Sequence, residues 1–206
     1  DRSANIEGGT PQDVGSNDEV VVLLPGLDSR KGDENPHCDA IHFFTLNLKS
    51  GTIKITTVPR GTYAYIPGSH APSEYYLSNA CAFEGIDYGI AQIEKVAGIK
   101  HDYLVEVGFS QTLGILRLFD LPTTTTLQWL RHRQSYAIGE PQRSHNQAVY
   151  MKDMIVAQLH RFRDDFSVSM QYILFKTVDT DLDFPTVRAL LEVYLDAKID
   201  EHPELI

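Results

Sequence analysis

The residues of this chain that could carry chemistry are acidic and basic side chains at the ends of apolar runs. Asp28 and Arg30 follow the apolar run 20–24, and Asp39 directly precedes a second run that begins at residue 40. A carboxylate and a guanidinium on the loop leaving a buried strand occupy the usual site edge of an α/β sheet. Two aspartates at neighbouring strand ends would also suit Mg²⁺, which accepts one or two carboxylates and takes its other ligands from water and phosphate. The alternative is that both aspartates only cap turns.

Arginines form the second set of candidates. Arg60 ends a β-branched run, Arg131 and Arg133 come close together after a helical segment, and Arg143 opens a longer one. The planar fork of arginine suits phosphate, because it gives bidentate, charge-assisted hydrogen bonds. The alternative is that these arginines lie scattered on the surface and pair with some of the 28 acidic residues.

The composition narrows the function classes. A chain of 206 residues, 42% hydrophobic and 22% charged, fits one globular domain with its own core. The net charge of −10 argues against nucleic acid as a partner, because neutralising phosphates requires a basic surface. No apolar run approaches the ~20 residues that cross a bilayer. The sequence also lacks the His-Glu-x-x-His, Gly-x-Ser-x-Gly and P-loop patterns of common metalloproteases, hydrolases and nucleotide-binding proteins.

Candidate strands and helices are interleaved along the chain. Residues 1–18 are polar and are expected to be a linker or an unstructured N-terminus, and residues 19–206 are expected to form the domain. Apolar and β-branched runs predict strands at 20–24, 40–48, 52–58, 62–66 and 103–107. Helical spacing and capping residues predict helices at 73–83, 87–97, 111–118, 125–131, 143–162, 168–177 and 184–197. This order is typical of an α/β or α+β domain of three layers.

Cys38 and Cys81 are the two cysteines of the chain, which is too few for a disulfide scaffold. They could form one bridge in an oxidising compartment, or they could be two small buried hydrophobic residues. The sequence leaves both possibilities open.

Taken in order, several blocks resemble the LytR-CpsA-Psr family. The segment 23–30 resembles its opening strand and Gly-Val-Asp-Ser-Arg loop, and 37–41 resembles Arg-Ser-Asp-Thr-Ile. The segment 58–63 is similar to Ile-Pro-Arg-Asp-Thr-Tyr, and 77–85 to the helix Ile-Asn-His-Ala-Tyr-Ala-Tyr-Gly-Gly. Further blocks are Asp102-Tyr103, Leu130-Arg131-His132-Arg133, and Gly139 to Arg143 with Gln147. The shared order and spacing make coincidence a poor explanation.

This resemblance implies an α/β fold of three layers, in which helices wrap a central mixed sheet. It also implies an apolar pocket for a polyprenyl tail, with the pyrophosphate head at its mouth. The implied activity is a phosphotransferase that moves a glycopolymer from a polyprenyl pyrophosphate carrier to a peptidoglycan acceptor, or a pyrophosphatase. The domain would lie outside the cytoplasm, in the cell envelope, attached to the membrane through an anchor that precedes residue 1.

The resemblance also assigns roles to the candidate residues. Asp28 and Asp39 would hold Mg²⁺ or Mn²⁺ and, with Arg60 and Arg131, would be catalytic. The phosphate-binding residues would be Arg30, Arg60, Arg131, Arg133 and Arg143. Such a set fits phosphoryl transfer, which depends on positioning and on neutralising developing charge.

Four positions depart from the family pattern. They are His37, Gly61, Asn79 and Asn146, where the family has arginine, aspartate, histidine and arginine. The departures support the alternative function, a non-catalytic envelope module that binds polyprenyl (pyro)phosphate. Cys38 and Cys81 lie beside positions that line the site in the family, so a bridge is feasible, although two reduced, buried thiols are slightly favoured.

Overall fold

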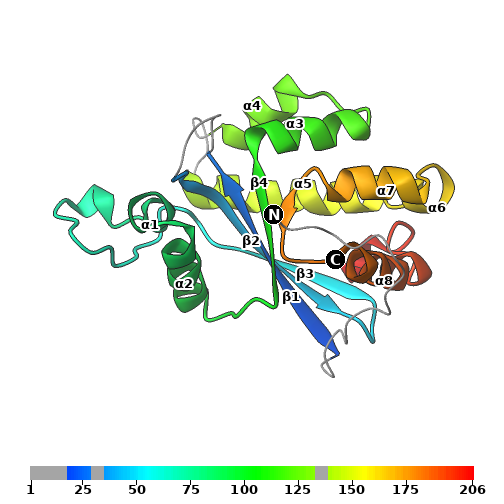
Figure 1. Ribbon diagram of the computed structural model, residues 1–206, viewed down its shortest axis with the longest axis horizontal. Coiled ribbons are helices and arrows are strands. Elements are labelled where there is room, and N and C mark those ends of the chain that lie inside the picture. Colours follow the sequence, from blue (N-terminus) through cyan, green and yellow to red (C-terminus); the bar gives the residue numbers. More distant parts are fainter. Residues whose placement is uncertain (1–17, 29–34, 133–138) are drawn as a thin grey trace.

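The computed structural model describes residues 18–28, 35–132 and 139–206, and shows a five-stranded sheet with helices on both faces (Figure 1). The strand order is β3-β2-β1-β4-β5. β1 runs parallel to β4 but antiparallel to β2, and β2–β3 and β4–β5 are antiparallel pairs, so the sheet is mixed. The predicted three-layer α/β fold is therefore confirmed.

The strands alternate their side chains between two faces. Their bounds are β1 Glu19–Leu27, β2 Cys38–Asn47, β3 Thr52–Thr57, β4 Tyr103–Gly108 and β5 Asp179–Thr180. Leu23, Ile41 and Phe43 are fully buried on one face. Leu24 and His42, each one residue further along in its strand, point to the opposite face, as the period of two requires.

Two helices cover the first face. They are α1 Leu77–Glu84 and α2 Ile86–Ala97, and their buried side chains Leu77, Ile90 and Ile93 share a core with Leu23 and Phe43. Gly89 allows α2 to approach α1, because a Cβ at this position would lie 2.8 Å from the Cα of Cys81.

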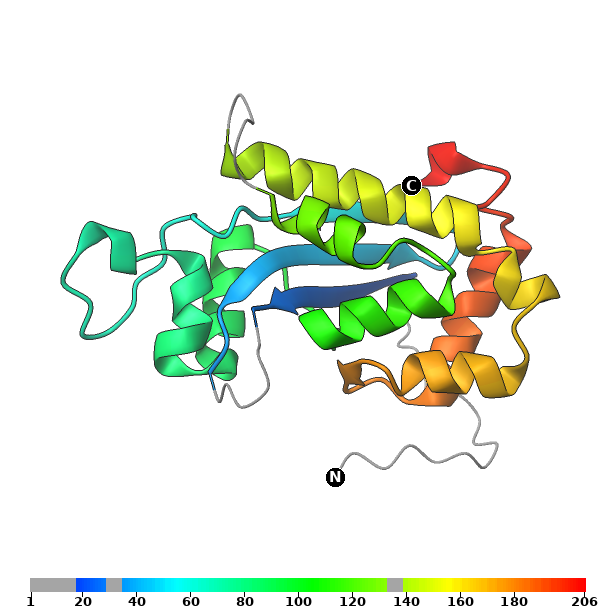
Figure 2. The same ribbon diagram turned by 90° about the horizontal axis from the view of Figure 1, so that it is seen from above.

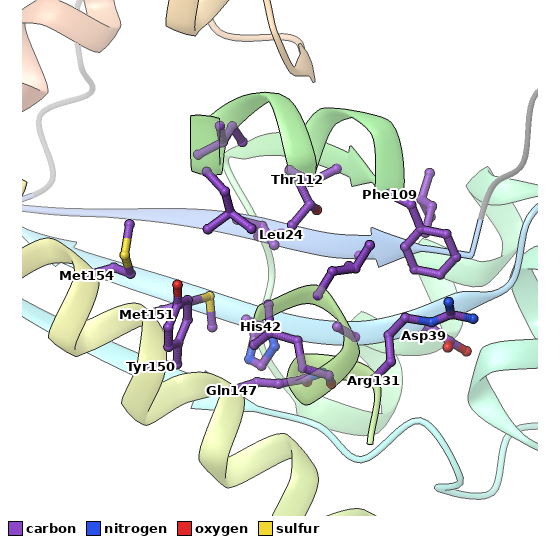
Figure 3. Close-up of a pocket in the computed structure, with 18 of the residues that line it drawn as sticks. Leu24, Asp39, His42, Phe109, Thr112, Arg131, Gln147, Tyr150, Met151 and Met154 are labelled. Carbon is purple, nitrogen blue, oxygen red and sulfur yellow. The ribbon is translucent and has the colours of Figure 1, made fainter. Parts of the chain in front are cut away.

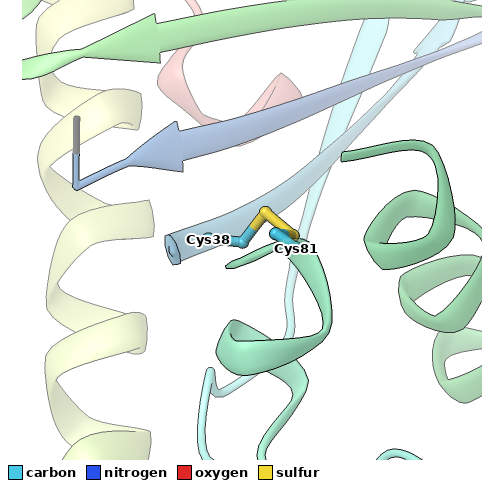
Figure 4. Close-up of a disulfide and its surroundings, with 2 residues drawn as sticks. All are labelled: Cys38 and Cys81. Carbon is cyan, nitrogen blue, oxygen red and sulfur yellow. A yellow bond between two sulfur atoms is a disulfide. The ribbon is translucent and has the colours of Figure 1, made fainter. Parts of the chain in front are cut away.

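The first face also contains a disulfide between Cys38, at the start of β2, and Cys81 on α1 (Figure 4). The two Cα atoms are 5.9 Å apart, and both side chains are buried. The slightly favoured prediction of two reduced, buried thiols is therefore wrong.

The remaining helices cover the second face, or lie at its end (Figure 2). They are α3 Phe109–Leu118, α4 Thr124–Arg131, α5 Glu140–Gln158, α6 Arg161–Asp164, α7 Val168–Phe175 and α8 Phe184–Asp196, followed by the short 3-10 turn η2 Pro203–Leu205, whereas another 3-10 turn, η1 Pro72–Glu74, precedes α1. α8 begins as predicted, since Asp183 accepts a hydrogen bond from the backbone N–H of Thr186 at 2.7 Å. No helix in the described ranges is long and apolar enough to cross a membrane.

Several predicted boundaries were wrong. β1 continues through Pro25 and Gly26, although its pairing with β4 skips Leu24 and Pro25, where proline has no N–H to donate. The predicted strand 62–66 contains only an isolated bridge between Tyr63 and Tyr76. The helix predicted to begin at Ser73 begins at Leu77, after a 3-10 turn. Residues 1–17 of the predicted linker lie outside the described residues.

Candidate functional site

The second face of the sheet forms the floor of a cavity of about 380 Å³ beneath α3, α4 and α5 (Figure 3). Most of its wall is apolar. Its lining includes Leu24, Phe44, Val107, Ile115, Leu127, Leu130, Met151, Met154 and Ile155. Its polar lining residues include Asp39, His42, Arg131, Arg143 and Gln147. In Figure 3, Asp39 and Arg131 lie together at one end, beside Phe109, and Met154 lies at the other.

A β-bulge directs Asp39 into this cavity. Gly26 pairs with Ala40 and Leu27 pairs with Cys38, so Asp39 is an extra residue with no partner position on β1. Such a bulge bends the strand and re-aims a side chain. Gly26 is needed opposite the bulge, because a Cβ there would lie 2.9 Å from the Cβ of Ala40. The bulge therefore places a buried carboxylate, 7% exposed, at the polar end of the cavity.

Arg143 holds the strand at this bulge. It is 2% exposed, and its Nη2 donates a hydrogen bond to the backbone carbonyl of Asp39 at 2.5 Å. Its Nε also donates to Oε1 of Glu140 at 2.9 Å, within the first turn of α5. Arg143, which the resemblance makes a phosphate-binding residue, lies in the cavity wall, but much of its hydrogen bonding serves the protein framework. The geometry gives it a positioning role.

Arg60 and Arg131 approach the same carboxylate region from other elements. Arg60, just after β3, forms an ion pair with the Asp39 side chain. The guanidinium of Arg131, at the end of α4, lies 4.3 Å from the centre of the Phe109 ring. Stacking by its face leaves the N–H groups at the edge of a guanidinium available for an anion. Three arginines that are distant in the sequence are thus brought to one end of the cavity.

Asp28 lies just beyond β1, where its backbone N–H donates to the carbonyl of His37 at 2.9 Å. Its Oδ1 is buried and has no hydrogen-bond partner among the described residues. A buried carboxylate oxygen without a donor suits a cation, so Asp28 fits one half of the predicted metal site. Asp39, the other half, already contacts Arg60. The described ranges contain no group of three His, Cys, Asp or Glu that could hold a metal.

His42 is a site residue that was not among the candidates found in the sequence. It lies in the cavity floor, is 2% exposed, and its Nδ1 has no hydrogen-bond partner in the described part of the chain. Burial lowers its pKa to about 4, the neighbouring Gln147 side chain opposes the shift, and the positive charge of Arg143 adds to it. His42 is therefore neutral at pH 7. The strand alternation that puts Phe43 in the core could have indicated its position.

Gln147 and Glu140 were also missed as site residues, although both lie in a block that resembles the family. Gln147 Nε2 donates to the backbone carbonyl of Leu130 at 2.8 Å and so joins α5 to α4. Glu140 fixes Arg143. The role of Gln147 is revealed by its contact with another helix, and the role of Glu140 by Arg143, which contacts Asp39 on β2.

Four positions named from the sequence remain outside this geometry. Arg30 and Arg133 lie outside the described residues. Asn79, at a departing position, donates to the carbonyls of Ser73 and Glu74 at 3.2 and 3.1 Å, so its amide serves the turn before α1. Among the described residues, nothing lies within 4 Å of the place where a Cβ of Gly61 would be.

Comparison with known proteins gives the class to which this fold and site belong. The LytR_cpsA_psr family matches residues 2–113, more than half of the chain, and the chain belongs to this family. The resemblance found in the sequence is thereby confirmed.

One relative is a protein of Bacillus cereus (strain AH820) named polyisoprenyl-teichoic acid–peptidoglycan teichoic acid transferase TagU. It is 30% identical over 139 residues, which are 66% of this chain and 44% of that protein. A Bacillus licheniformis protein of the same name is 30% identical over 129 residues, which are 62% of this chain and 41% of that protein. The chain thus spans less than half the length of these curated relatives.

Solved structures share the fold at lower sequence identity. TagV of B. subtilis superposes with a TM-score of 0.67 at 19% identity, over 85% of this chain and 79% of that chain. The structure of TagT bound to LI-WTA superposes with a TM-score of 0.62 at 18% identity, over 93% of this chain and 82% of that chain.

Proposed function

We propose that this domain is a phosphotransferase that moves a glycopolymer from a polyprenyl pyrophosphate carrier to a peptidoglycan acceptor. The observation that carries the proposal is the apolar cavity whose polar end is formed by Asp39, Arg131 and Arg143, with Arg60 behind Asp39. Family membership and the names of the TagU relatives agree with this activity. The domain would work outside the cytoplasm, at a membrane to which an N-terminal segment anchors it.

The two parts of the cavity match the two parts of such a ligand. An apolar tail is stabilised by leaving water for the wall of leucine, isoleucine and methionine side chains. The pyrophosphate would lie at the other end of the cavity. Positive charge is supplied there by Arg131, which stacks on Phe109, and by Arg60, which pairs with Asp39. The negative charge of the whole molecule does not oppose this, because the arginines converge locally.

The transfer step follows from this arrangement. A sugar hydroxyl of the acceptor attacks the phosphorus that bears the glycopolymer. A new P–O bond forms, the bond to the bridging oxygen breaks, and polyprenyl phosphate leaves with the electron pair. The hydroxyl proton passes to a carboxylate of the site or to water. Arg131 and Arg60 would stabilise the charge that develops on the phosphate oxygens.

Asp28 and Asp39 would hold Mg²⁺ or Mn²⁺ if the enzyme uses one. The buried Oδ1 of Asp28 is the feature that fits this role, and two carboxylates are enough when water and phosphate complete the shell. A bound divalent ion supplies charge neutralisation at the pyrophosphate.

A transfer assay tests the proposal. Wild-type protein, Mg²⁺, a polyprenyl pyrophosphate with a labelled glycan and a peptidoglycan acceptor are combined, and labelled acceptor is measured. Asp28→Asn and Asp39→Asn are expected to abolish transfer, while Asp153→Asn, at an exposed position of α5, leaves it unchanged.

The alternative function is a module that binds polyprenyl (pyro)phosphate without turnover. The engagement of the Asn79 amide with backbone carbonyls favours it, because the NH2 donor at this position serves the turn before α1 and not a ligand. Wild-type protein that binds the lipid but never transfers the glycan, with Mg²⁺ or Mn²⁺, would establish the alternative and refute the transferase.

A further inference from the structure

The segment between β3 and α1 presents a group of exposed tyrosine rings that the cavity does not use. Tyr63, Tyr65 and Tyr76 are 66%, 57% and 42% exposed, and together they are called the tyrosine platform. Large aromatic side chains at such exposure are unusual for a surface with no ligand, because each leaves apolar area in water.

The backbone places the three rings on one face. Tyr63 and Tyr65 alternate with Ala64 and Ile66, which are 2% and 0% exposed, so the two tyrosines point outward on the same side. Tyr76 is the antiparallel bridge partner of Tyr63, and directly opposed residues project to the same side.

Hydrogen bonds fix the backbone of the platform, and one of its rings is stacked on a neighbour. The N–H of Ala64 donates to the carbonyl of Tyr75 at 3.0 Å, and the Tyr88 hydroxyl donates to the carbonyl of Tyr65 at 2.8 Å. The ring of Tyr63 also stacks on Tyr75, with centroids 5.6 Å apart and an interplanar angle of 25°. The fixed backbone and the stacked Tyr63 ring lose little conformational entropy when a ligand arrives.

The platform continues from the polar end of the cavity. Tyr63 is three residues after Arg60, the partner of Asp39, so its Cα lies within about 10 Å of the Arg60 Cα. The backbone carbonyl of Arg60 also accepts a hydrogen bond from Ser78, next to the platform, at 3.0 Å. Figures 1 and 2 both show this segment beyond the end of the sheet where β2 begins.

The chemistry of the platform suits a carbohydrate. The C–H face of a sugar ring packs against an aromatic ring, and its hydroxyls can hydrogen-bond with a tyrosine hydroxyl, which combines an apolar body with a polar tip. Phosphate alone would call for cations, and Tyr63, Tyr65 and Tyr76 supply none.

We infer that the tyrosine platform binds the first sugar residues of the donor glycan, where this glycan leaves the pyrophosphate. The inference rests on the proposed function, because the polar end of the cavity must hold the pyrophosphate. The sugar attached to this pyrophosphate then emerges beside Arg60, and Tyr63 and Tyr65 follow along the exit.

The test compares two ligands on the same proteins. Binding of a bare polyprenyl pyrophosphate and of the same lipid carrying an oligosaccharide is measured for wild type, Tyr63→Ala/Tyr65→Ala and Tyr63→Phe/Tyr65→Phe. Ile173→Ala on α7, at 51% exposure, is the control for loss of an exposed apolar side chain.

The alanine variant is expected to weaken binding of the glycosylated lipid about tenfold and to leave the bare lipid unchanged. The phenylalanine variant should lose less affinity than the alanine variant, because it keeps both rings and lacks only the hydroxyls, and Ile173→Ala should stay close to wild type. Equal affinity of wild type and alanine variant for the glycosylated lipid would overturn the inference, as would an equal loss for both lipids. Failure of wild type to bind the bare lipid would instead refute the proposed function.

The tyrosine platform could instead contact a second copy of this chain. Sedimentation velocity of the wild type and the alanine variant tests this alternative. A monomer in both cases is expected. A wild-type dimer that the alanine variant abolishes would assign the platform to self-association and overturn the inference.

Discussion

The two faces of the central sheet are built from the same strands but differ in packing. On the first face, Leu23, Ile41 and Phe43 are all 0% exposed and pack against α1 and α2. On the second face, their neighbours Leu24, His42 and Phe44 line a cavity of about 380 Å³. The disulfide strengthens the first face, and the arginines gather on the second.

This difference indicates that the two faces of the sheet have different roles. The first face is close-packed, while the second face packs against α8 in one part and, beneath α3, α4 and α5, leaves apolar surface uncovered and accepts a buried histidine and a buried arginine. Buried polar groups and an unfilled cavity both reduce stability, so their concentration on one face indicates that this face serves binding.

Phe43→Ala gives the sharpest contrast between the faces. Removing this fully buried ring should lower the free energy of unfolding by about 3–5 kcal/mol. Phe44→Ala should cost clearly less, because its ring already borders a cavity. Urea unfolding of both variants measures the difference. Equal losses would show that the second face is packed as closely as the first.

The disulfide is the next largest contribution to the first face. Cys38→Ala/Cys81→Ala should lower the free energy of unfolding by about 2–4 kcal/mol, because the bridge closes a chain segment with a sequence separation of 43. Reduction of the wild type before urea unfolding should produce a similar loss. Reductant should have no further effect on the double variant. If reduction left the free energy of unfolding of the wild type unchanged, the stabilising role of the disulfide would be contradicted.

The buried His42 on the second face should make the free energy of unfolding depend on pH. Its pKa falls from 6.5 in the unfolded chain to about 4 in the fold. Between these values the unfolded state binds more protons, so stability is complete above pH 6.5 and is lost as the pH falls toward 4. The loss amounts to at most about 3 kcal/mol.

His42→Gln removes this titration and serves as the comparison. Urea unfolding of both proteins at pH 7 and pH 5 should show a smaller loss on acidification for the variant. A variant that loses as much stability as wild type would assign the acid sensitivity to other groups.

The smallest effect is expected in the apolar part of the cavity wall, away from the arginines. Met151→Leu conserves volume, so the free energy of unfolding should change by less than about 1.5 kcal/mol. Affinity for a polyprenyl pyrophosphate should also stay near the wild-type value, because the wall remains apolar. A large loss of affinity in a stable variant would show that the thioether makes a specific contact.

The sequence predicted the main elements wherever a signal was local. The run 20–24 and the spacing of apolar residues in 87–97 correspond to β1 and α2. Other features depend on tertiary contacts. β5 has two residues, too few for a periodic pattern, and its pairing with β4 defines it. The strand predicted at 62–66 has the right alternation, but it finds a partner at a single bridge.

The candidate site shows the same limit. Asp39 and Arg131 were found through the family-like blocks, and the structure places both in the cavity wall. The bulge that aims Asp39 was not predictable, because it is a mismatch between two strands. The hydrogen bond from Arg143 to the Asp39 carbonyl joins residues 104 positions apart, so no local sequence pattern could predict it.

The central claim is that the cavity binds a polyprenyl chain with a pyrophosphate at its arginine end. Trp129, the single tryptophan, is a native reporter, since its ring centre is 5.7 Å from that of Tyr150, which lines the cavity. Its fluorescence is followed while the wild type is titrated with a polyprenyl pyrophosphate and with the polyprenol of equal length. The same titrations are made on Ala40→Phe, in which the new ring fills the cavity floor. We predict saturable binding of the pyrophosphate, at least about tenfold weaker binding of the polyprenol, and none by Ala40→Phe. Equal affinity for both lipids, or binding that Ala40→Phe leaves intact, would contradict the account.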